Sequence, residues 1–243
     1  MTQPSLLLTA PIGRTIIRLA APNMLAMVVT MATFMAEAWY VGQLGTEALA
    51  GLALGFPMLM LVMMLSAGSF GGTITGAVAR LLGADDREGA ELLSLNAVLM
   101  MLLLAGLCSA IFLLGGREIY SLLGGRGRVL EQALAYSNVL FAGCVSLWLT
   151  NALAAVVRAT GHMSVAAKCL LAGSLLQVIV AGGLVFGLGP LPSMGIAGAA
   201  AGIVFGNTIA AILLLNFLVN RCVELRLRIS GMRLKMASII KLF

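Results

Sequence analysis

The stretch MAEAWYVGQLGTEALAG, residues 35–51, decides how the rest of the chain is organised. It begins inside an apolar run, places one carboxylate there at Glu37, and leaves through a glycine-punctuated turn into a second apolar run. A carboxylate near the end of a membrane span is costly, so it usually has a function and faces away from lipid. Glu37 is therefore the leading functional candidate. The competing interpretation is an inert acid, wetted at the membrane interface.

The composition of the chain makes lipid the solvent for much of its surface. Of the 243 residues, 61% are hydrophobic and 10% are charged, against about 25% charged residues in an ordinary soluble domain. The apolar runs are long and continuous, whereas a membrane barrel would show short alternating segments. The predicted fold class is all-α, a polytopic membrane protein.

Six apolar runs are long enough, at roughly 20 residues each, to cross a bilayer. They are 19–41, a span within 48–79, 92–114, 133–157, 169–188 and 195–219. The second run is too long for one straight span, and Pro57 within it predicts a kink. The predicted organisation is a cytoplasmic N-terminal segment at 1–18, a six-span transmembrane lobe at 19–219 and a basic cytoplasmic inter-lobe linker at 220–243.

The basic residues predict the orientation of these spans. The connections on one side, together with both termini, hold twelve Lys and Arg residues, whereas the other side holds only Arg117, Arg126 and Arg128. By the positive-inside rule, both termini are cytoplasmic. The net charge of +6 is therefore assigned to the membrane surface, and nucleic acid is not expected as a partner.

Two spans carry glycines at a spacing of four residues, which lets helix backbones approach closely in lipid. The two rows are Gly68, Gly72 and Gly76 in the second span, and Gly198, Gly202 and Gly206 in the sixth. Tight helix packing is the predicted role of both rows.

Three stretches resemble segments of the multidrug and toxic compound extrusion (MATE) transporters. EAWYVGQLGTEALA at 37–50 is similar to the end of the family's first span. GADD at 83–86, with the charged run to Glu91, is similar to its span 2–3 loop, and VRATG at 157–161 to the end of its span 4. GIAGAA at 195–200 is a weaker fourth similarity. Order and spacing match over nearly the whole chain.

The resemblance implies a cation-coupled antiporter that exports organic, often cationic, drugs or toxic compounds. Family members have twelve spans in two six-helix lobes around a central cavity, and this chain corresponds to the N-terminal lobe. IIRL at 16–19 recurs as IIKL at 239–242, where a second repeat of the same orientation would begin. We therefore expect a second six-helix lobe as partner, either a missing C-terminal half or a second copy.

The resemblance also implies a cation site in which the span 1 acid meets an Asn and an Asp of span 5 and a Thr of span 6. The span 1 acid is Glu37, but the span 5 positions are Gln177 and Ala181, and the span 6 position is near Ile203. A Na⁺ ion wants several hard oxygen ligands, by analogy with other hard cations. The residues that remain favour H⁺ over Na⁺ as the coupling ion, and we expect no cofactor and no metal site. The alternative is that the coupling acids lie in the second lobe.

Other polar residues extend the candidate site. Thr33 and Asn23 share roughly the Glu37 face of span 1, because their offsets are near whole helical turns. The predicted proton, cation or substrate-binding residues are Glu37, Gln177, Thr33 and Asn23. Asn151 and Asn207 also lie within spans, and each is interpreted as a helix–helix hydrogen-bonding residue.

The predicted function is export of small organic cations across the plasma membrane, the inner membrane of a bacterium. One alternative is a lipid-linked precursor flippase of the same superfamily, but that would favour a basic cavity, and the spans carry no Lys or Arg in their middles. A second alternative is a half-length protein that acts as a homodimer. An enzyme is not expected, because the chain offers no plausible His cluster, Ser-His-Asp set or paired-carboxylate site.

Overall fold

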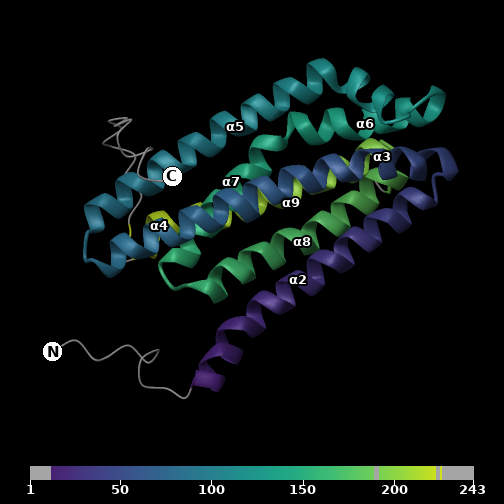
Figure 1. Ribbon diagram of the computed structural model, residues 1–243. Coiled ribbons are helices and arrows are strands. Elements are labelled where there is room, and N and C mark those ends of the chain that lie inside the picture. The colour runs from purple at the N-terminus through teal and green to yellow at the C-terminus, as the bar shows by residue number, and fades with distance from the viewer. Residues whose placement is uncertain (1–11, 189–191, 223–224, 226–243) are drawn as a thin grey trace.

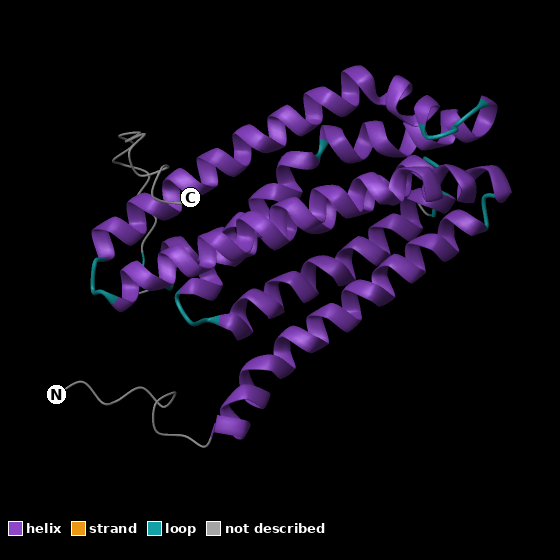
Figure 2. Ribbon diagram, viewed as in Figure 1, coloured by secondary structure: helices purple, strands orange, loops and turns teal. Residues whose placement is uncertain are grey.

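In the computed structural model, the described residues, 12–188, 192–222 and 225, form a bundle of long helices with no strand among them (Figures 1 and 2). The helices are α2 (Ile12–Gly42), α3 (Thr46–Met63), the π-helix η1 (Met64–Phe70), α4 (Gly71–Gly83), α5 (Arg87–Leu122), α6 (Gly127–Ala142), α7 (Cys144–Ala159), α8 (Met163–Phe186) and α9 (Ile196–Asn220). The predicted all-α class is confirmed. The side chains of 12–23 and 26 lie outside the described part, as do most of the predicted linker and 189–191 of the last loop.

The helices cover the predicted spans. Helices α5, α8 and α9 are each long and apolar enough to cross a membrane, and so is the continuous helical stretch Thr46–Gly83 that joins α3, η1 and α4. Helix α2 extends over the first predicted span and begins earlier, at Ile12. The π-helical segment interrupts the second span beyond Pro57, and π turns of this kind are frequent at functional sites.

The fourth predicted span, 133–157, is not one straight helix. It is divided between α6 and α7, whose axes differ by 49° at a break around Gly143. A Cβ atom built at Gly143 would clash with the side chain of Val204 on α9. The bend therefore occurs where α9 approaches the backbone so closely that only glycine fits, which hydropathy does not reveal.

The two glycine rows behave differently. In α9, a Cβ added at Gly202 would lie 2.5 Å from the Cβ atom of Ala181, and one at Gly206 would lie 2.6 Å from the carbonyl oxygen of Gly173. Tight packing of α8 on α9 is therefore confirmed for the sixth span. For Gly68, Gly72 and Gly76 the prediction of packing is wrong within the described lobe, because an added Cβ would meet no atom within 4 Å. These three lie on the outward face, opposite the buried Ile74 and Val78.

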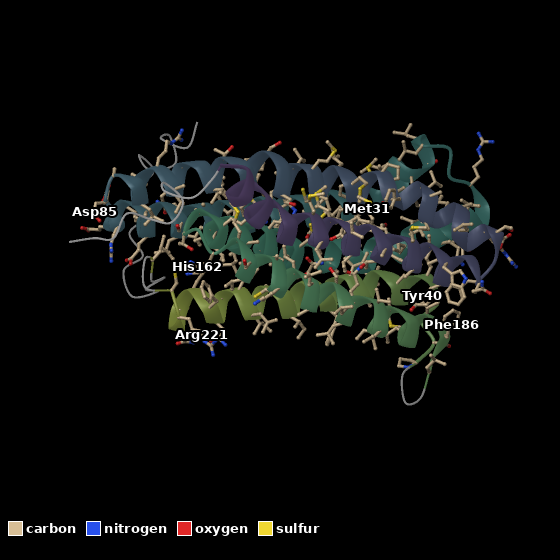
Figure 3. All side chains as sticks on the ribbon, turned by 90° about the horizontal axis from the view of Figure 1, so that it is seen from below. Met31, Tyr40, Asp85, His162, Phe186 and Arg221 are labelled. Carbon is tan, nitrogen blue, oxygen red and sulfur yellow. The ribbon has the colours of Figure 1, made fainter. Side chains whose placement is uncertain are left out.

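The turns collect at two ends of the bundle. Figure 3 shows Asp85, His162 and Arg221 at one end, and Tyr40 and Phe186 at the other. The first three belong to connections that the charge distribution assigns to the cytoplasm, and the last two lie near the opposite ends of α2 and α8. This alternation is what antiparallel membrane spans require, and it places Glu37 toward the end of α2 that carries Tyr40.

Candidate functional site

Glu37 is held inside the lobe by one hydrogen bond. Its side chain lies on α2 and is only 5% exposed, and the hydroxyl group of Tyr136 on α6 donates to its Oε1 atom over 2.9 Å. Tyr136 is itself fully buried. A carboxyl group with a single polar partner in an apolar setting is rare, because burial of a charge costs several kcal/mol unless it is paired.

Two glycines of α3 make room for this contact. A Cβ added at Gly51 would lie 2.6 Å from the Cβ atom of Gln132, and one at Gly55 would lie 3.0 Å from the ring of Tyr136. Helix α3 therefore passes unusually close to α6 at the level of the phenol ring. Close packing of α3 and α6 fixes where Tyr136 can point, and so fixes the position of its hydroxyl group beside Glu37.

A groove between α2 and α3 reaches Glu37 from the other side. Its volume is about 550 Å³, and its lining is apolar except for Glu37. The aromatic and sulfur-containing side chains that line it are Met31, Phe34, Met35, Phe56 and Met60. The rings of Phe34 and Phe56 meet edge to face at 5.6 Å. Flexible Met side chains and aromatic faces adapt to organic molecules of varied shape, and aromatic faces attract cations.

The other predicted site residues lie in a second hollow. Thr33 and Gln177 line a polar cavity of about 240 Å³ enclosed by α2, η1, α7, α8 and α9. Glu37 does not line this cavity, although Phe34 borders both hollows. The hydroxyl group of Thr33 donates to the carbonyl oxygen of Val29 over 2.8 Å. The fourth predicted residue, Asn23, belongs to α2, but its side chain lies outside the described residues.

The two amides that were interpreted as packing residues also line the polar cavity. Asn151 donates from Nδ2 to the hydroxyl oxygen of Ser66 over 2.8 Å, a bond between α7 and η1 of the kind predicted. Asn207 instead donates to the carbonyl oxygen of Ile203 in its own helix over 2.9 Å. Its backbone carbonyl group accepts a 2.7 Å bond from Thr150, which ties α9 to α7.

The described residues do not rebuild the multi-ligand cation site that the resemblance implies. Ala181 packs against Gly202, and Ile203 presents an apolar side chain to the polar cavity. Among the described residues, no group of three or more His, Cys, Asp or Glu side chains is placed to hold a metal ion. What remains is one carboxyl group in an apolar groove and a separate cavity lined by amides and hydroxyl groups.

Tyr136 was not among the residues predicted from the sequence. A tyrosine inside an apolar span needs a hydrogen-bond partner for its hydroxyl group, and this requirement was a usable signal. The pair Gly51 and Gly55 repeats the spacing of four that marked the two predicted glycine rows. Neither signal could name Glu37 as the partner, because the two residues are 99 positions apart.

The MatE family model matches residues 22–182, which include Glu37, Tyr136 and most of both hollows. The chain belongs to the MatE family. The resemblance found in the sequence motifs is thereby confirmed.

Two curated proteins are similar in sequence to this chain. A protein named "FAD transporter" from Shewanella oneidensis is 28% identical over 204 residues, which cover 84% of this chain and 45% of that protein. A protein named "Probable multidrug resistance protein NorM" from Thermotoga maritima is 24% identical over 218 residues, 89% of this chain and 46% of that protein. The chain therefore spans about half the length of the curated relatives that it matches.

Solved structures agree with the family assignment. A MOP superfamily transporter from Pyrococcus furiosus, described as having a binding pocket of reverse polarity, matches with a TM-score of 0.87 at 25% identity. The match covers 100% of this chain and 53% of that one. An outward-facing multidrug resistance MATE family transporter matches with a TM-score of 0.85 at 26% identity, over 93% of this chain and 49% of that one.

Proposed function

We propose that this chain is one lobe of a proton-coupled antiporter that exports organic cations. The observation that carries the proposal is the position of Glu37, which is the single acid among the residues lining a groove of about 550 Å³ between α2 and α3. An organic cation and a proton compete for one carboxyl group, so binding of either releases the other. Competition of this kind is the simplest route to exchange transport.

The chemistry of the groove supports an organic cation over an inorganic one. Glu37 supplies one negative charge, and Met31, Met35, Phe34 and Phe56 supply apolar and aromatic contacts. A Na⁺ ion would require several oxygen ligands, and the described lining of the groove offers the Glu37 carboxylate as its one charged oxygen donor. A proton needs only that carboxylate. Proton coupling therefore requires fewer groups than sodium coupling.

A second six-helix lobe is the proposed partner, with both termini of this chain on the cytoplasmic side of a bacterial inner membrane. Support comes from the share of the relatives that the chain covers, 45% of the FAD transporter and 53% of the Pyrococcus transporter. An immunoblot of native membranes tests this. A band at about twice the 25.2 kDa of this chain indicates a fused second lobe, and a 25.2 kDa band that crosslinks to a dimer indicates a second copy. A chain that transports as a monomer contradicts the proposal.

The transport proposal is tested with the protein in proteoliposomes and ethidium as the cation. A pH gradient, and not a Na⁺ gradient of equal size, is expected to drive ethidium movement. Glu37→Gln should abolish the response to the pH gradient, and Glu37→Asp should keep part of it. Glu47→Gln is the matched control, because Glu47 is exposed and lies 3.5 Å from Arg128 outside the groove. Full activity of Glu37→Gln, or equal driving by Na⁺, would overturn the proposal.

A further inference from the structure

The polar cavity holds a positive charge that the proposed exchange at Glu37 does not use. Arg158, in the last turn of α7, lines the cavity and is half-buried. Among the described residues lining the cavity it is the one charged side chain. It forms no ion pair and no hydrogen bond with any described residue. The five N–H groups of its guanidinium group need acceptors wherever water does not reach them.

The position of Arg158 at the end of α7 satisfies only part of its hydrogen-bonding capacity. A cation in the last turn of a helix interacts favourably with the carbonyl groups at that end. That interaction leaves the N–H groups on the cavity side free to bind an acceptor. The other α7 residue that lines the cavity is Asn151, two helical turns away on the same face. Its Nδ2 atom is already engaged with Ser66.

A second unpaired donor lies on α8. Gln177 is 8% exposed, lines the cavity, and makes no hydrogen bond with any described residue. Ser174, on the same face of α8, also lines the cavity without such a bond. Buried amides of this kind are normally hydrogen-bonded, to protein or to a bound molecule. Gly206 lets α9 pass close to Gln177, because a Cβ added there would lie 2.7 Å from the Cβ atom of Gln177.

We propose that this cavity is a binding site for a small oxyanion, a phosphate or carboxylate group. Arg158 supplies the positive charge, and Gln177 and Ser174 supply further N–H and O–H donors from the facing helix. The volume of about 240 Å³ is several times the roughly 30 Å³ that one water occupies in the liquid, so a small anion fits together with water. No carboxylate is present among the described lining residues to pair with Arg158 or to attract a cation.

Anion binding is measured on the purified protein in uncharged detergent. Inorganic phosphate and acetate are the probes, and chloride at equal ionic strength is the reference. A ligand that binds only the folded protein raises its unfolding temperature in proportion to occupancy. Phosphate or acetate, but not chloride, is expected to raise that temperature. Arg158→Gln should weaken the response about tenfold, because a charge-assisted bidentate bond is lost. Arg158→Lys should restore part of it. Arg80→Gln, an exposed arginine of α4, is the control that should change nothing.

Gln177→Glu provides an independent test of anion binding. The new carboxylate would place a negative charge in the cavity that Arg158 lines, so it should repel an anion and remove the phosphate response. Phosphatidylglycerol added to the micelles distinguishes a lipid phosphate from free phosphate as the ligand. A lipid bound through Arg158 would compete with inorganic phosphate. Equal responses to phosphate and chloride, or an undiminished phosphate response in Arg158→Gln and Gln177→Glu, would overturn the proposal.

Discussion

The hydroxyl group of Tyr136 on α6 donates a 2.9 Å hydrogen bond to the carboxyl group of Glu37 on α2. This bond joins the first and fourth spans inside the lobe, and it is the one hydrogen bond assigned to the Glu37 side chain among the described residues. It sets which way the acid points and how strongly it holds a proton or a cation. The groove between α2 and α3 reaches the same carboxyl group.

Tyr136→Phe should reduce ethidium transport several-fold and lower stability by about 1–3 kcal/mol, because it leaves a buried carboxyl group without its donor. Transport in proteoliposomes and thermal unfolding in detergent measure the two effects. Tyr40→Phe, on the same helix as Glu37, is the control and should be silent, since its ring contact with Phe186 at 5.7 Å is kept. Additive effects of Tyr136→Phe and Glu37→Gln on the unfolding temperature, or undiminished transport in Tyr136→Phe, would contradict the role given to this bond.

Phe56→Ala should weaken the apparent affinity for aromatic cations by about two- to tenfold, the loss expected for a cation–π contact of partly exposed geometry. Phe56 lines the groove and meets Phe34 edge to face, so the substitution removes one aromatic face from the route to Glu37. The measurement is the concentration dependence of transport for ethidium and for a small non-aromatic cation. Phe205→Ala, an exposed phenylalanine of α9 outside the groove, should leave both unchanged. Equal losses for the two variants would contradict the assignment.

Gly202→Ala should lower the stability of the chain and Gly72→Ala should raise it, although each substitution adds one methyl group to a helix. At Gly202 the methyl carbon would lie 2.5 Å from the Cβ atom of Ala181, so overpacking should cost about 1–3 kcal/mol. At Gly72 it would meet nothing within 4 Å, and the better helix propensity of alanine should stabilise the chain by up to about 1 kcal/mol. Thermal unfolding of both variants of this chain in detergent makes the comparison. A loss of stability in Gly72→Ala would mean that the outward row is packed against something.

Gln43→Cys should react with a membrane-impermeant maleimide in intact cells, whereas Asp85→Cys should react only after permeabilisation. Both positions are exposed, and they belong to connections at opposite ends of the bundle. The native cysteines are replaced in this experiment to remove background labelling. The reverse labelling pattern would invert the topology predicted from the distribution of Lys and Arg.

The location of the apolar helices was predictable because it depends on local free energies. A run of about 20 apolar residues is stable in lipid whatever its neighbours are, and basic loops orient it. For the same reason the acid at Glu37 could be recognised as unusual from the sequence. The close packing of Gly198, Gly202 and Gly206 followed from a spacing that places small residues on one helix face.

Contacts between helices were decided only by the tertiary structure. The sequence could not predict that Glu37 pairs with Tyr136, or that the fourth span bends where Val204 meets Gly143. Nor could it predict that the glycine row containing Gly72 faces outward. It also placed Thr33 and Glu37 on one face, whereas packing directs them into different hollows. A helical period states which residues share a face, but the neighbour that covers this face depends on how the helices pack. The sequence alone therefore determined the membrane class, the position of the apolar helices and the unusual acid within the first of them, and the packing of α2, α3 and α6 decided what that acid contacts.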